Sequence, residues 1–174
     1  MESSDNKTFF EKFLGFKFGI IAASFSTLWM IYLFVTKSVI SPIGRVSMLI
    51  VPVALFAGVY FSIYQFRKKA MDGKMSFKNG FKTGLQSIVA YSIIIAFATF
   101  ICQAVIYPEF SIDVIANAKA KGIAEHVDVK IMNDILNKMK HDAMIGPQIT
   151  KTVFGGLFMG SIFSLLCAGL MRRE

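Results

Sequence analysis

The sequence predicts an all-α integral membrane protein with four transmembrane helices and a helical extramembrane loop between spans three and four. Of its 174 residues, 55% are hydrophobic and only 17% are charged, whereas about 25% are charged in ordinary soluble domains. Four runs of 19, 21, 26 and 20 residues contain no charged residue, and a bilayer-spanning helix needs about 20 mostly apolar residues. Four soluble core helices are excluded, because such runs leave no residues for a polar face.

The first two spans are predicted at about residues 18–36 and 46–66. The segment before the first span carries three acids and three lysines. A cleaved signal peptide has a basic start, a short apolar core and a small-residue cleavage site, so the first run is predicted to be a retained span. Pro42 and Gly44 form the tight turn between the two spans. Residues 1–174 are predicted to form a single transmembrane domain.

A basic link, residues 67–84, separates spans two and three and holds six of the nineteen Lys and Arg residues. With the amino terminus inside, the inner segments hold 11 basic residues in 36 positions, and the outer segments hold 8 in 52. Cytoplasmic loops are enriched in Lys and Arg, so both termini are predicted to lie in the cytoplasm. The candidate contacts for anionic lipid headgroups are Arg67, Lys68, Lys69, Lys74, Lys78 and Lys82.

The third span, at about residues 84–107, carries several polar side chains, but none of the four runs contains Asp, Glu, Lys, Arg or His. Ionisable residues within a bilayer mark proton relays and ion paths. Their absence from the runs argues against proton- or ion-coupled transport by a single chain. Gln103 lies about one turn from the outer end of this span. We expect it to bond a neighbouring helix or headgroup water, and a substrate contact is the alternative.

Two short helices are predicted in the outer loop, at residues 109–147. The first is expected to begin at Ser111 as N-cap and to stop at Gly122, and the second to begin at Asp128 as N-cap. An apolar stripe at helical spacing follows in the second helix. Such a helix lies on the bilayer surface or across the mouth of its own bundle. A docking surface is the alternative, and its candidate residues are Ile131, Ile135 and Met139.

The fourth span, at about residues 152–171, repeats a small residue every four positions. Small residues at this spacing let two membrane helices approach closely. The first span carries a similar stripe. We expect both stripes to pack within the bundle, and a contact face for a partner or a second copy is the alternative. The candidate helix-packing residues are Gly156, Gly160, Ser164, Ala168, Gly19 and Ala23.

No catalytic, cofactor-binding or metal-ligating constellation is visible in the sequence. Cys102 and Cys167 lie near opposite ends of their spans, whereas a disulfide needs Cα atoms within about 7 Å. His126 and His141 lack the tight ligand spacings of metal sites. The net charge of +8 is explained mostly by membrane topology. The sequence therefore predicts no enzyme, no cofactor, no metal and no nucleic-acid partner.

The order of these parts resembles a family of four-span membrane proteins found mainly in Bacteroidota and catalogued as domain of unknown function 4199. The resemblance rests on the basic FRKKAMDGKMSFKNGFKTG link, the YPEF tetrapeptide at residues 107–110, the helical outer loop, and the glycine-rich last span with its basic tail. It brings no catalytic residue with it. It implies a bacterial inner (cytoplasmic) membrane. Because members of this family are encoded near glycosyltransferases, it also implies a link to envelope glycoconjugate assembly.

Two functional classes fit the sequence. The first is a non-enzymatic subunit or scaffold of a membrane or envelope complex, which holds another membrane protein or a second copy of the chain. The second is a small transporter or a lipid- or glycolipid-handling protein whose bundle opens a groove. The absence of intramembrane charge favours the first class. In both classes the lipid bilayer is a partner of the chain.

Overall fold

The computed structural model describes residues 2–70 and 73–172, with residues 2–12 and 70 described by their backbone alone. Asp72 of the basic link and Arg173 of the basic tail lie outside the described residues. The described chain contains helices and no strand. In order, its elements are α1 (Glu2–Val35), the 3₁₀ turn η1 (Ser38–Ile40), α2 (Pro42–Ser47), α3 (Ile50–Ala70), α4 (Phe77–Ile101), the π-helical turn η2 (Cys102–Ile106), α5 (Phe110–Ala124), α6 (Val129–Asp142) and α7 (Ile145–Met171).

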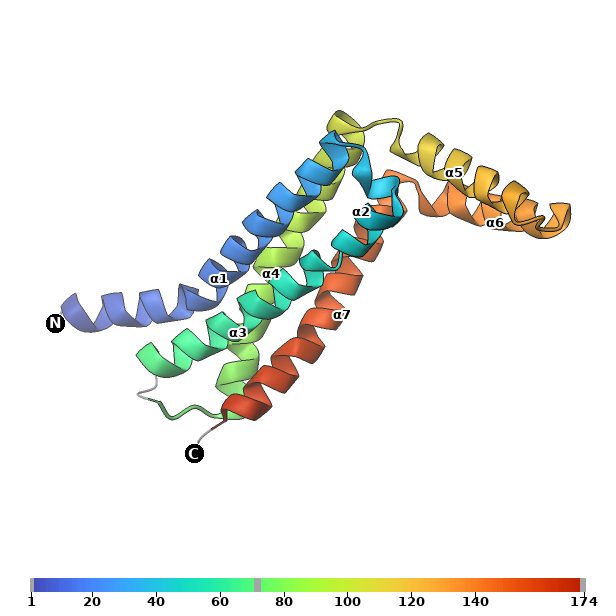
Figure 1. Cartoon of the computed structure of the whole chain (residues 1–174). Helices are drawn as coiled ribbons and strands as arrows, with labels where there is room; N and C mark the ends of the chain where they lie inside the picture. Colours follow the sequence, from blue (N-terminus) through green and yellow to red (C-terminus); the bar gives the residue numbers. More distant parts are fainter. Residues whose placement is uncertain (1, 71–72, 173–174) are drawn as a thin grey trace.

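Within the described residues, four helical segments are long and apolar enough to cross a membrane: Phe13–Val35, Pro42–Lys69, Phe77–Ile106 and Ile145–Met171. They form one bundle, and the helical pair α5–α6 projects from one end of it (Figure 1). The predicted fold class, an all-α membrane protein with four spans and a helical loop after the third, is confirmed. We call the end that carries α5 and α6 the arm end, and the opposite end, where α3 leads into α4, the link end.

The third span begins earlier than the uncharged run does. α4 starts at Phe77, because the side chain of Ser76 accepts a hydrogen bond from the Asn79 N–H at 3.4 Å and caps the helix. Lys78 and Lys82 therefore lie on the first turns of α4 and are exposed. Long Lys side chains can extend toward water while their stems stay in an apolar layer, so a helix can begin before its uncharged run does.

The inner pair α3 and α4 holds the bundle together. Each of these helices packs against the other three spans, and α1 and α7 lie on opposite sides of the pair (Figure 1). Val59 and Ile63 of α3 and Ile88 of α4 are fully buried between them. A second apolar cluster fills the arm end of the bundle, where Phe34 and Cys102 are buried.

One polar side chain ties three spans together near the middle of the bundle. The hydroxyl of Tyr91 in α4 donates to the backbone carbonyl of Val51 in α3 at 3.0 Å and hydrogen-bonds Ser26 Oγ of α1 at 2.9 Å. Tyr91 is 3% exposed, and Ser26 is fully buried. A buried hydroxyl without partners would be costly in this setting, so the hydrogen bonds fix how these three helices sit against one another.

Small residues bring α7 close to α4 over four successive steps. A β-carbon placed on Gly160 would lie 2.7 Å from the Ile88 side chain, closer than real contacts allow, and one on Gly80 would lie 3.2 Å from Ala168. The contacts recur every four residues on both helices. The residue numbers rise along α7 as they fall along α4, so the two helices are antiparallel. The facing pairs are Gly156 with Ser92, Gly160 with Ile88, Ser164 with Gly84, and Ala168 with Gly80.

The stripe on α1 meets another side of α4. A β-carbon on Gly15 would lie 2.7 Å from the Thr83 carbonyl oxygen, and one on Gly19 would overlap the backbone of Ser87. Ala23, one step further along, is fully buried. Gly15 faces Thr83 and Gly19 faces Ser87, so the residue numbers rise in the same direction along both helices. α1 and α4 therefore run parallel. α4 therefore has close-packed helices on two of its faces.

We expect Gly160→Leu to separate α7 from α4. Overpacking a fitted contact costs about 1–3 kcal/mol, so the variant should lose thermal stability in mild detergent. Gly155→Leu is the matched control, because Gly155 is exposed and its β-carbon would meet nothing within 4 Å. Equal melting temperatures for the two variants would show that the α4–α7 contact does not hold the bundle together.

Candidate interaction surface

The pair α5–α6 is the main extramembrane feature of the described chain, and we call it the arm (residues 110–142). It projects sideways from the arm end of the bundle, crosswise to the spans (Figure 1). α5 packs against α6 and the η1 turn, and α6 packs against α5 and the start of α7. The arm is thus held at its base and along its own hairpin, while much of its surface is open.

The YPEF tetrapeptide forms the corner where α4 gives way to the arm. Tyr107 is 3% exposed, its ring packs edge-on against Phe34 and Phe110, and its hydroxyl donates to the Asp113 carboxylate. Glu109 pairs with Lys37 at 3.5 Å. The Lys37 ammonium also lies 4.7 Å from the centre of the Tyr107 ring. These contacts join the end of α1, the end of α4 and the first turn of α5.

The tyrosine of this corner stays protonated over the physiological range. Burial, the hydrogen bond to Asp113 and the negative charges of Asp113 and Glu109 together raise the pKa of Tyr107 to about 12. The phenol is therefore a hydrogen-bond donor to Asp113 at neutral pH. A raised pKa of this kind stabilises the corner below the ordinary tyrosine pKa of about 10, and the contribution is lost as the pH rises toward 12.

The predicted helix ends are correct for the start of α6 and wrong for α5. Asp128 is the N-cap of α6, as predicted, and accepts from the Lys130 N–H at 2.8 Å. The prediction for α5 is wrong at both ends. Ser111 lies inside the first turn, because the Phe110 ring packs on Phe34 and the helix starts two residues earlier, with Glu109 as its N-cap. Gly122 does not end α5 but is buried under the Met132 side chain of α6.

The predicted apolar stripe of α6 is only partly covered by the protein. Ile131 is 55% exposed and Ile135 is 45% exposed, and Met139 is half-buried. Ile135 and Met139 line a cavity of about 420 Å³ between the arm and the η1–α2 corner, where Val39 and Arg45 form part of the other wall. The stripe therefore lies on the side of α6 that faces the η1–α2 corner, which we call the underside of the arm. The opposite face of α6 is polar and exposed, with Lys130, Asn133, Asp134, Asn137 and Lys138.

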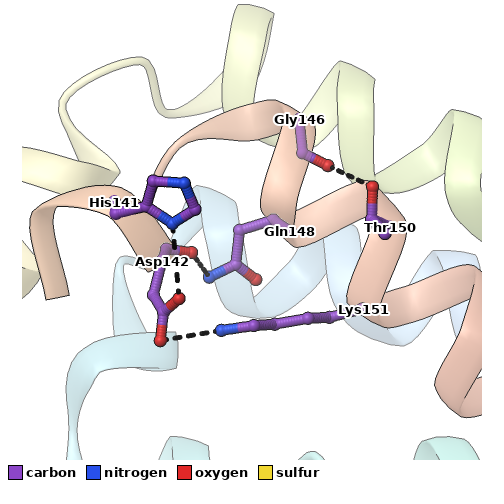
Figure 2. Close-up of polar contacts among 6 residues, drawn as sticks. All are labelled: His141, Asp142, Gly146, Gln148, Thr150 and Lys151. Carbon is purple, nitrogen blue, oxygen red and sulfur yellow. Dashed lines mark hydrogen bonds and ion pairs between the residues drawn. The ribbon is translucent and has the colours of Figure 1, made fainter. Parts of the chain in front are cut away.

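A polar joint fixes the arm to the fourth span (Figure 2). Lys151 Nζ lies 2.8 Å from Asp142 Oδ2, and Gln148 donates to the Asp142 backbone carbonyl at 2.8 Å. His141 Nδ1 lies 3.8 Å from the same carboxylate. The hydrogen bond from Lys151 lowers the pKa of Asp142, so the carboxylate stays ionised at neutral pH. Sequence analysis missed this joint, because the partners belong to different helices and no motif relates them.

Of the six basic residues in the link, Arg67 is hydrogen-bonded to another helix, and the five lysines are exposed. Arg67 donates from Nη1 to the backbone carbonyl of Met171 at 3.3 Å and so ties α3 to the last turn of α7. A cation at a helix carboxyl end also interacts favourably with the helix dipole. Met75, in the same link, is 1% exposed and reaches into the bundle core. The exposed members of the predicted headgroup set are Lys68, Lys69, Lys74, Lys78 and Lys82.

The structure places no group of three or more His, Cys, Asp or Glu side chains suited to a metal among the residues it describes. Cys102 and Cys167 are both buried and free.

The architecture is that of a multi-pass helical membrane protein with a helical arm at one end of its bundle. The chain belongs to the family described as protein of unknown function (DUF4199), whose family model matches residues 17–173. This confirms the resemblance drawn from the sequence. No curated protein and no solved structure matches the chain.

We expect Ile135→Lys to loosen the arm, because it places a charge in the cavity under α6. The arm segments 128–140 should become more accessible to trypsin at Lys138 and Lys140, while the four spans stay inserted. Asn133→Lys adds the same charge on the exposed face of α6 and serves as the control. If both variants are cleaved at the rate of the parent, the underside of α6 is not a buried contact.

Proposed function

We propose that this protein is a non-enzymatic subunit or scaffold of a membrane or envelope complex, and that the arm is its interaction element. The observation that carries the proposal is the arrangement of α6. This helix packs against α5 along the hairpin, and its last residue is joined to α7 by the Asp142–Lys151 pair, while its polar face is exposed along its length. A helix that is held in place and exposes a continuous polar face is suited to docking a partner.

The underside of the arm is suited to rest on the bilayer. The arm leaves the bundle sideways from the end of the spans (Figure 1), which brings its apolar stripe to the level of the membrane surface. Full burial of an isoleucine side chain contributes about 1.5–3 kcal/mol, and contact with the bilayer would supply roughly half of this for Ile131 or Ile135, because each is already about half covered. A helix of 14 residues is marginal in water on its own, so this contact would help to keep α6 formed and oriented.

The interior of the bundle supports a scaffold more than a transporter. Its centre is filled by fully buried side chains such as Ile63 and Ile88, and by the Tyr91 hydrogen bonds that tie α1, α3 and α4. Small-residue contacts hold α4 against α7 and α1. Alternating access would have to separate these fitted surfaces. Interiors packed in this way resist gradual deformation.

We further propose that the chain lies in the bacterial cytoplasmic membrane with both termini in the cytoplasm. Four spans bring the two ends of the chain to the same side, which is the link end (Figure 1). The link end also carries the denser basic segments, and Lys and Arg are retained on the cytoplasmic side. The exposed link residues Lys68 and Lys74 are then positioned to meet anionic headgroups, each contributing about 1 kcal/mol.

The orientation is tested with single cysteines in a chain whose Cys102 and Cys167 are replaced by Ala. A thiol reagent that cannot cross the inner membrane should label Lys130→Cys in intact cells with a permeabilised outer membrane. It should label Lys74→Cys only after the inner membrane is broken. Labelling of Lys74→Cys alone in the intact cells would reverse the topology.

The scaffold role is tested by site-specific photo-crosslinking in native membranes. A photoreactive amino acid at Asn133 or Asn137, on the polar face of the arm, should yield one discrete protein adduct. The same amino acid at Leu28, which is 68% exposed on α1 within the membrane-spanning segment, should yield lipid adducts and serves as the control. Asp142→Asn, which removes the charge that pairs with Lys151, should lower the yield at Asn133. If the arm positions form only lipid or solvent adducts, the proposal fails.

A further inference from the structure

The small-residue contact between α4 and α7 opens into a groove toward the arm end. Beyond Gly156 the next step of four along α7 is Thr152, so the side chains between the helices become larger and the helices cannot stay as close. The result is an open groove of about 670 Å³, lined by side chains from Val89–Phe100 of α4 and Ile149–Leu157 of α7. Its lining is apolar apart from Ser92.

A smaller cavity with polar lining lies one helical turn further toward the arm end. It has a volume of about 250 Å³ and lies between the end of α4 and the starts of α5 and α7. Gln103 and Ser111 supply its polar side chains. Gln103 is 6% exposed, and its Oε1 atom has no hydrogen-bond partner among the residues described. An unpaired buried carboxamide oxygen costs free energy, and a donor from a bound molecule would remove that cost.

The dimensions of the groove and the cavity match one lipid chain in one leaflet. Ser92 of α4 and Gln103 of η2 are 11 residues apart along one continuous helical segment, which is about 16 Å along the helix axis. Half of a hydrocarbon core of about 30 Å is nearly the same length. Gln103 also lies one turn inside the end of the third span at Ile106. That is the depth at which the linkage between a lipid chain and its headgroup is expected.

We propose that the groove between α4 and α7 holds a single acyl chain of a lipid from the arm-side leaflet, and that Gln103 recognises an amide linkage at its head. A secondary amide offers one N–H donor and one carbonyl acceptor, and the Gln103 carboxamide offers the complementary oxygen and nitrogen. An ester linkage has no donor for Oε1. The terminal torsion of a Gln side chain is broad, so the carboxamide can turn toward the cavity.

A second apolar groove separates this site from general lipid contact. It lies between α1 and α3, has a volume of about 410 Å³, and is lined by Phe18, Phe25 and Phe61 among other residues. Its lining residues are apolar throughout, so it can contact any acyl chain. A preference for one linkage is expected at the α4–α7 groove, because the Gln103 carboxamide lines the cavity next to its arm-end opening. The proposal does not depend on whether the arm binds a partner.

The test uses two photoreactive lipids with the same acyl chain, one amide-linked to an amino alcohol and one ester-linked to the corresponding diol. The full-length protein is reconstituted in vesicles of phosphatidylethanolamine and phosphatidylglycerol with a trace of either probe. After irradiation, adducts on residues 89–100 and 149–157 are measured by mass spectrometry. One hydrogen bond predicts about three- to tenfold more adduct from the amide probe than from the ester probe.

Four variants separate the proposed site from annular lipid. Gln103→Leu should keep adduct formation but bring the amide-to-ester ratio to one. Ala96→Trp should fill the groove and remove most adducts from both segments, and Val153→Trp should do the same from α7 if the first variant folds poorly. Leu28→Trp is the depth-matched control on α1 and should change nothing. Equal labelling of the parent by the two probes, or equal losses in Ala96→Trp and Leu28→Trp, would overturn the proposal.

Discussion

The arrangement of this protein depends on how closely α4 approaches its two neighbours. Lipid chains are as apolar as the side chains they touch, so helices in a bilayer associate through contact at small residues rather than through the hydrophobic effect. At Gly160 and Gly19 even one added carbon would overlap the facing helix. With α7 and α1 packed on two faces of α4, α3 closes the bundle, and Tyr91 fixes the levels of three helices. The position of the arm follows, because its base is built on the ends of α1, α4 and α7.

The spans and their small-residue faces could be predicted because the bilayer imposes simple requirements. A run of about 20 uncharged residues suffices to locate a span, and a repeat of four suffices to locate a close face. The facing surface could not be identified in the same way. Gly80 of α4 belongs to the basic link, outside the predicted span, yet Ala168 packs against it. The helix extends into the charged segment because Ser76 caps it and its Lys side chains can reach water, and neither effect appears in a count of uncharged residues.

The interaction surface was predictable where a local hydrogen bond decides and not where tertiary packing does. The Asp128 cap involves neighbours two and three residues away, so the sequence alone identifies it. Ser111 and Gly122 carry equally good local signals, and both were overridden, by Phe110 packing on Phe34 and by Met132 covering Gly122. The Asp142–Lys151 pair joins two helices whose relative position no local pattern determines. The unpaired state of Gln103 depends on the α4–α7 separation and could not be inferred before the helices were placed.

The π-helical turn at Cys102–Ile106 sets the direction in which the chain leaves the third span and enters the arm. The Tyr107 N–H donates to the Cys102 carbonyl at 2.8 Å, five residues back instead of four. One surplus residue rotates the following side chains by about 100° relative to an uninterrupted α-helix. That rotation brings Tyr107 between Phe34 and Phe110. The number of residues in this turn therefore determines the direction in which the arm projects from the bundle. Deletion of one residue from the turn would leave the spans unchanged but would rotate the arm to a different direction in the membrane plane.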